Sequence, residues 1–180
     1  MGRGLERRYI FENDDDKSEF LDQLGRSLEK SDAVCLAWAV MSNRYHLLIR
    51  VGVDPLSRLM ASLPTGYVVN YNRRHDRSGY LYQNRFKSIL CDEDEYLLKL
   101  ISYIHLNPWK AGMLSRLVEL DGYPWTGHAG LLGQHVQEWQ AIDEALNFFQ
   151  AILTKLEEPI GSLCGINLKI TYRSTCPGVG

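Results

Sequence analysis

Apolar residues recur with helical spacing between residues 96 and 112. The apolar stripe falls at i, i+3, i+4 and i+7, as expected for an amphipathic helix, and consists of Leu97, Leu100, Ile101 and Ile104. Tyr103 and Asn107 are four residues apart, so both side chains are predicted to point the same way at the flank of this stripe. Two interpretations are open. Either a phenol and an amide are placed together for chemistry, or Tyr103 packs at the flank and Asn107 ends the helix before Pro108.

Two neighbouring segments predict a β-hairpin. Residues 33–40 form a near-continuous apolar run, which is typical of a buried strand. Residues 43–51 alternate instead. Tyr45, Leu47, Ile49 and Val51 are predicted on one face, and the other face carries Arg44, His46, Leu48 and Arg50. Because only a few residues join the two segments, we expect an antiparallel pair.

Further helices are predicted on both sides of the hairpin. Asn13 or Asp14 can cap a helix that runs to about residue 30. Asp54 and Pro55 form a helix-start signal, with an expected interruption at 64–66 and a resumption over 67–74. Residues 138–156 read as another amphipathic helix, residues 8–11 as the end of a strand, and the tail from residue 159 shows little pattern.

The order helix–strand–strand–helix predicts an α/β (α+β) fold with a ferredoxin-like palm, a mainly antiparallel sheet and helices packed on it. A chain of 180 residues is expected to form one main domain, here 1–128, followed by a C-terminal helical extension and tail at 129–180. No apolar run is long enough to cross a membrane, and no signal peptide is recognised. The four cysteines show no CxxC spacing, so reduced thiols and a cytoplasmic location are expected.

The net charge of −2 conceals a basic central segment. Residues 43–87 carry few acidic side chains and many basic ones, namely Arg44, Arg50, Arg58, Arg73, Arg74, Arg77, Arg85 and Lys87. This segment predicts either an anion-binding surface, with nucleic acid as the first candidate, or a solvated charged face. Residues 80–90 combine aromatic rings with basic groups, a pairing that suits stacking on bases and neutralising phosphates.

Four stretches together resemble one family. They are AWAVMSNRYHLLIR at 37–50, NRRHDRSGYLYQNRFKSIL at 72–90, YIHLNPWKAG at 103–112 and GYPWTG at 122–127. In order and spacing they resemble the single-tyrosine HUH transposases, and in particular the bacterial REP-associated tyrosine transposases. The resemblance covers residues 3–128. It implies a cytoplasmic, nucleoid-associated protein that binds single-stranded or hairpin DNA.

In that family a tyrosine attacks a phosphodiester of single-stranded DNA, forms a 5′-phosphotyrosine intermediate and leaves a free 3′-OH; strand transfer reverses this step. The resemblance assigns Tyr103 as nucleophile. It assigns His46 and Asn107 as ligands of a divalent metal, expected to be Mg²⁺ or Mn²⁺. The DNA-binding residues it implies are Arg50, Asn72, Arg73, Arg74, Arg85 and Lys87.

The sequence departs from the family at two places. Arg44 occupies the position of the first HUH histidine, and a guanidinium has no lone pair to offer a metal, so binding is expected to be weak and nicking impaired. The first strand of the family is also expected to be missing, which would expose a sheet edge and allow a homodimer. Three hypotheses follow: a transposase, a non-catalytic DNA-hairpin-binding protein on the same scaffold, or a degenerate fragment. A less favoured role for Arg44 is direct contact with the scissile phosphate.

Overall fold

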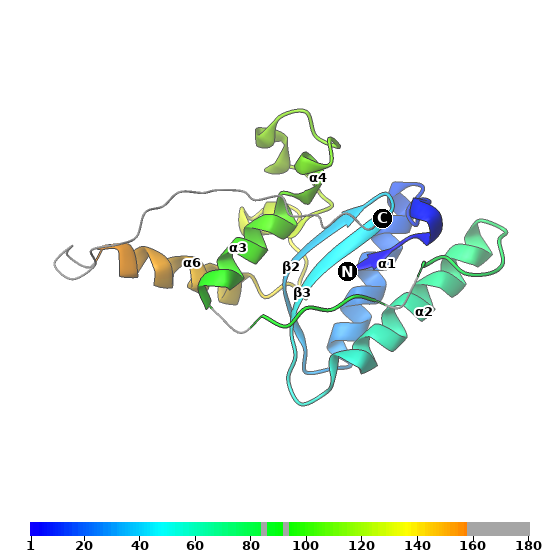
Figure 1. The fold of residues 1–180 in the computed structure, drawn as a ribbon, viewed down its shortest axis with the longest axis horizontal. Helices are drawn as coiled ribbons and strands as arrows, with labels where there is room; N and C mark the ends of the chain where they lie inside the picture. The colour runs from blue at the N-terminus through cyan, green and yellow to red at the C-terminus, as the bar shows by residue number, and fades with distance from the viewer. Residues whose placement is uncertain (84–85, 92–93, 158–180) are drawn as a thin grey trace, which may run out of the picture.

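The computed structural model describes residues 1–83, 86–91 and 94–157 of the chain. Its centre is a three-stranded antiparallel sheet with the spatial order β1 (Gly2–Arg3), β3 (Arg44–Arg50) and β2 (Val34–Met41) (Figure 1). β2 and β3 form the predicted hairpin, in which Met41 pairs with Arg44. The alternation along β3 is confirmed, because Tyr45 faces one core cluster and Leu48 faces the other.

Two long helices cover one face of the sheet (Figure 1). α1 (Asp14–Glu29) begins where predicted, since the Asn13 side chain accepts a hydrogen bond of 2.9 Å from the Asp16 amide. α2 (Leu56–Arg74) packs against α1, and both helices bury apolar side chains against the Tyr45 face of β3. This cluster is the larger core of the molecule.

The opposite face of the sheet carries α3 (Asp94–His105) and α6 (Ile142–Glu157) (Figure 1). Ile101 and Ile104 of the predicted stripe are buried against β2 and β3. The helix ends earlier than residue 112, because Pro108 has no amide hydrogen and its ring crowds the preceding turn. α4 (Asn107–Lys110) is therefore a separate short helix.

The predicted α+β class with an antiparallel sheet and packed helices is confirmed. The chain order β1–α1–β2–β3–α2, with β1 next to β3, is that of a ferredoxin-like palm. Two described residues that follow α2 lie beside β1, where the amides of Gln83 and Lys87 donate to the carbonyls of Arg3 and Met1 at 3.1 Å. Where the sequence predicts that the first strand is missing, the structure has the two-residue strand β1. The hydrogen bonds from Gln83 and Lys87 cover part of the outer edge of β1, and the homodimer prediction depends on that edge being exposed.

Two sequence predictions are wrong. Residues 8–11 form no strand; the amides of Ile10 and Phe11 instead donate to the Ser42 carbonyl of the hairpin turn. α2 also runs without interruption through Pro64. A proline inside a helix costs about 3 kcal/mol, whereas full burial of a large apolar side chain contributes about 1.5–3 kcal/mol. Leu63 and Tyr67, on either side of Pro64, are both fully buried, so packing outweighs the proline.

Residues after 128 pack onto the same sheet. The Ala141 amide donates to the Cys35 carbonyl at 3.0 Å, and Trp38 Nε1 donates to Gln140 Oε1 at 2.9 Å. Trp139 lies so close to α1 that a Cβ on Gly25 would come within 2.6 Å of its ring. The short elements η1 (Leu5–Arg7), η2 (Leu117–Leu120) and α5 (Gly127–Leu131) complete the description. The predicted tail lies outside the described residues, and the proposed boundary at 128 stays a prediction.

Candidate functional site

Tyr103 lies on the exposed flank of α3, above the polar face of β3. Its side chain is 46% exposed, and its ring meets the His46 ring edge to face with centroids 6.3 Å apart. One turn further on, Asn107 Nδ2 donates to the Tyr103 carbonyl at 2.9 Å, so Oδ1 takes no part in this bond. Asn107 is only 6% exposed. The structure therefore places the Tyr103 ring against His46, while Asn107 contacts Tyr103 through its backbone carbonyl.

His46 is largely buried on the α3 side of β3. Its Nε2 atom is inaccessible and has no hydrogen-bond partner among the described residues. Burial lowers the pKa of His46 to about 4, and the positive charges of the Met1 amino group and of Arg44 act in the same direction. The imidazole is therefore neutral near pH 7 and keeps a lone pair on one ring nitrogen.

The residues present fit a divalent metal only in part. His46 can supply one neutral imidazole and Asn107 one amide oxygen, but Arg44, where the resemblance leads us to expect a histidine, cannot ligate a metal. No cluster of three or more His, Cys, Asp or Glu side chains with the geometry to hold a metal exists among the described residues. Arg44 also adds positive charge beside His46. This donor set does not make a complete Mg²⁺ or Mn²⁺ site.

One cationic side chain contacts the Tyr103 ring, and two more lie on the face of the sheet that carries His46. Lys110 Nζ lies 5.0 Å from the ring centroid, in a cation–π arrangement. Arg44, the first residue of β3, lies on the same face of the sheet as His46, and Arg3 of β1 is paired with Arg44. An exposed phenol in a basic environment of this kind suits a negatively charged partner.

The residues predicted to contact DNA are not all free to do so. Arg50 makes a two-bond pair with Glu144 of α6, with distances of 2.7 and 2.8 Å. Arg74 lies 2.6 Å from the buried carboxylate of Asp16. Both guanidinium groups are therefore already neutralised. The acidic start of α1 lies against the basic end of α2, which accounts for part of the charge asymmetry in the sequence.

The other predicted contacts occupy different surroundings. Asn72 Nδ2 donates to the Gly79 carbonyl at 3.1 Å and holds the turn after α2. Arg73 and Lys87 are exposed and make no ion pair within the part of the chain that the structure describes. Arg85 lies outside the described residues.

Two features of the site were missed in the sequence. Lys110 is not among the predicted site residues, although it is seven residues from Tyr103, a spacing that places two side chains on the same side of a helix. Arg3 is not among them either, because only the register of the sheet shows that it pairs with Arg44 across β1 and β3. His105 lies apart from this site. It is buried toward Gly127 and His128, and burial lowers its pKa to about 3.

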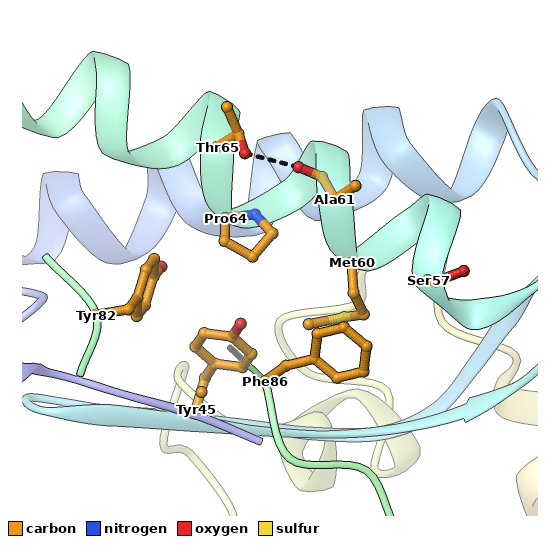
Figure 2. Close-up of a pocket in the computed structure, with 9 residues that line it drawn as sticks. Tyr45, Ser57, Met60, Ala61, Pro64, Thr65, Tyr82 and Phe86 are labelled. Carbon is orange, nitrogen blue, oxygen red and sulfur yellow. Dashed lines mark hydrogen bonds between the residues drawn. The ribbon is translucent and has the colours of Figure 1, made fainter. Parts of the chain in front are cut away.

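A separate cavity of about 260 Å³ lies on the other face of the sheet. Figure 2 shows it beneath α2, between Pro64 and Met60 above and Tyr45 and Phe86 below. Tyr82, which also lines the cavity, has a buried hydroxyl without a hydrogen-bond partner in the described residues. Because Tyr45 and His46 point to opposite faces of β3, this cavity is not part of the Tyr103 site.

No protein-family model, curated protein or solved structure matches the chain. Among the described residues, no helix is both long enough and apolar enough to span a bilayer.

Proposed function

We propose that this protein binds single-stranded or hairpin DNA on the scaffold of a single-tyrosine HUH transposase, and that its nicking and rejoining chemistry is impaired. The observation that carries the proposal is the contact between His46 of β3 and Tyr103 of α3, which are far apart in the sequence. An exposed Tyr103 phenol lies edge-on to a neutral His46, with Asn107 one turn away. These are the residue types that the resemblance implies for nucleophile and metal ligands.

The impairment follows from Arg44. It occupies the position of a metal-ligating histidine, offers no lone pair and places a permanent positive charge beside His46. The same charge favours a phosphate backbone, so loss of the metal ligand is compatible with continued DNA binding. Such a partner would place the protein with the nucleoid in a bacterial cytoplasm.

An active transposase is the second candidate, and the exposed Tyr103 phenol favours it. That hydroxyl makes no hydrogen bond within the described residues, so it is open to an incoming phosphodiester. The two candidates differ in whether a covalent protein–DNA adduct forms.

A paired experiment separates them. Hairpin DNA with a fluorescent label is titrated with wild type and with Tyr103→Phe, and the same mixtures with Mn²⁺ are run on a denaturing gel. We expect salt-dependent binding of similar strength by both proteins and no adduct above trace level. An adduct in wild type that is absent in Tyr103→Phe would establish the active transposase. Absence of salt-dependent binding would refute a DNA-binding function.

A further inference from the structure

Two arginines stand directly opposite each other on neighbouring strands. Arg3 of β1 and Arg44 of β3 are register partners in an antiparallel pair. Side chains in such positions share one face of the sheet, with Cβ atoms roughly 4.5–5.5 Å apart. This is also the face of His46, which follows Arg44 by two residues. Like charges directly opposite each other destabilise a sheet, so this arginine pair costs stability unless a bound group neutralises it.

Neither guanidinium is neutralised within the described residues. Other arginines of the chain are, since Arg50, Arg58 and Arg74 lie 2.7, 2.5 and 2.6 Å from a carboxylate oxygen. No described ion pair involves Arg3 or Arg44, and Arg3 Nε is inaccessible and without a hydrogen-bond partner. A buried donor that is left unpaired destabilises the folded state. Two positive charges and an unpaired buried donor on the His46 face of the sheet therefore favour the binding of an anion.

We propose that Arg3 and Arg44 together bind one phosphate group beside Tyr103, and that this phosphate belongs to the backbone of a single-stranded DNA. Guanidinium groups form parallel hydrogen bonds with phosphate oxygens, and two opposed groups can hold different oxygens of one phosphate. The identity of the phosphate as DNA rests on the proposed function, whereas the phosphate site itself rests on the strand register.

The first test is binding of a labelled single-stranded oligonucleotide that carries no terminal phosphate. Wild type is compared with Arg3→Gln, Arg44→Gln and the double variant, with Arg58→Gln as an exposed-arginine control. We expect each single variant to bind about tenfold more weakly and to lose about 0.7 from the slope of log affinity against log salt. The double variant should lose less than the product of the two effects, because both arginines hold the same phosphate.

Thermal unfolding excludes a trivial loss of fold. Since each single change relieves a like-charge pair, the variants should melt at or above the temperature of wild type in chloride. Replacing chloride by inorganic phosphate at equal ionic strength should raise the melting temperature of wild type and of Arg58→Gln. The increase should disappear in Arg3→Gln and Arg44→Gln.

The outcomes distinguish the two proposals. If wild type binds DNA and both arginine variants match Arg58→Gln in affinity and salt slope, the phosphate site is refuted while the DNA-binding function stands. If wild type binds no DNA but phosphate stabilises it through Arg3 and Arg44, the site stands and the DNA-binding function fails. If an acidic peptide displaces the oligonucleotide as well as phosphate does, the assignment to phosphate is overturned.

Discussion

Replacing Arg44 by histidine should restore a metal-dependent covalent adduct on Tyr103. The change removes a cation and supplies the imidazole that the family resemblance implies, two residues before His46 on the same face of β3. The exposed Tyr103 ring already meets His46, and Asn107 is hydrogen-bonded to the Tyr103 carbonyl. One substitution therefore tests whether the remainder of the site is intact.

The strand geometry sets the size of the expected effect. Residues two apart on a strand are separated by roughly 6.5 Å. At that distance a guanidinium and a dication repel by about 1 kcal/mol in bulk water and by about 5 kcal/mol at an effective dielectric of 20. Arg44 is half-buried, so the lower part of this range applies. Repulsion then lowers metal affinity about tenfold, and loss of a ligand adds at least a further 10–100-fold.

The assay is covalent trapping on hairpin DNA with Mn²⁺, resolved on a denaturing gel. Arg44→Gln is the matched control, because it removes the charge without adding a ligand, and it should recover only the smaller part of the metal affinity. All variants are compared at saturating DNA, since Arg44→Gln is also expected to bind DNA more weakly. Adding Tyr103→Phe to Arg44→His should abolish the adduct. An adduct of equal yield in wild type and Arg44→His, or one that persists without Tyr103, would refute this reasoning.

Three further predictions concern stability and charge. Burial holds the pKa values of His46 and His105 at about 4 and 3, below the ~6.5 of the unfolded chain, so the unfolded state binds protons first. The free energy of unfolding in urea should therefore fall as the pH drops from about 6.5 to 3; a His105→Gln variant with an unchanged pH dependence would contradict this. Asp16→Asn should cost about 3 kcal/mol in the same assay, because it removes the charge of a buried carboxylate bound to Arg74 and His75, whereas exposed Asp15→Asn should be nearly neutral. Arg50→Gln should leave DNA affinity within about twofold, since Glu144 already neutralises Arg50, and a tenfold loss would show that this pair opens on binding.

Elements whose apolar residues face one core were predictable from sequence. The alternation of residues 44–50 and the stripe ending at Ile104 report burial on one face, and both predictions are confirmed. The predicted helix interruption at Pro64 is wrong because the sequence shows the cost of a proline in a helix but not the burial of Leu63 and Tyr67, which offsets it. Residues 8–11 were misjudged because their partner, the Ser42 carbonyl, comes from a turn more than thirty residues away.

The candidate site was predictable only where its residues lie close in sequence or carry the family resemblance. Tyr103 and Asn107 are four residues apart, so their proximity follows from sequence spacing even though Asn107 begins the separate helix α4. The pairing of Arg3 with Arg44 depends on strand register, and that of Arg50 with Glu144 on the docking of α6. Neither pairing can be predicted from the local sequence pattern. Both pairings determine which basic residues remain available to bind an anion.

The most direct test of the account is the salt dependence of hairpin-DNA binding by the unmodified protein. Affinity measured by fluorescence anisotropy between about 50 and 200 mM salt should fall steeply, because each phosphate contact contributes about 0.7 to the slope for a single strand. A steep slope with no adduct on Tyr103 is the result that this account predicts. A flat slope, or no binding at any salt concentration, would contradict it.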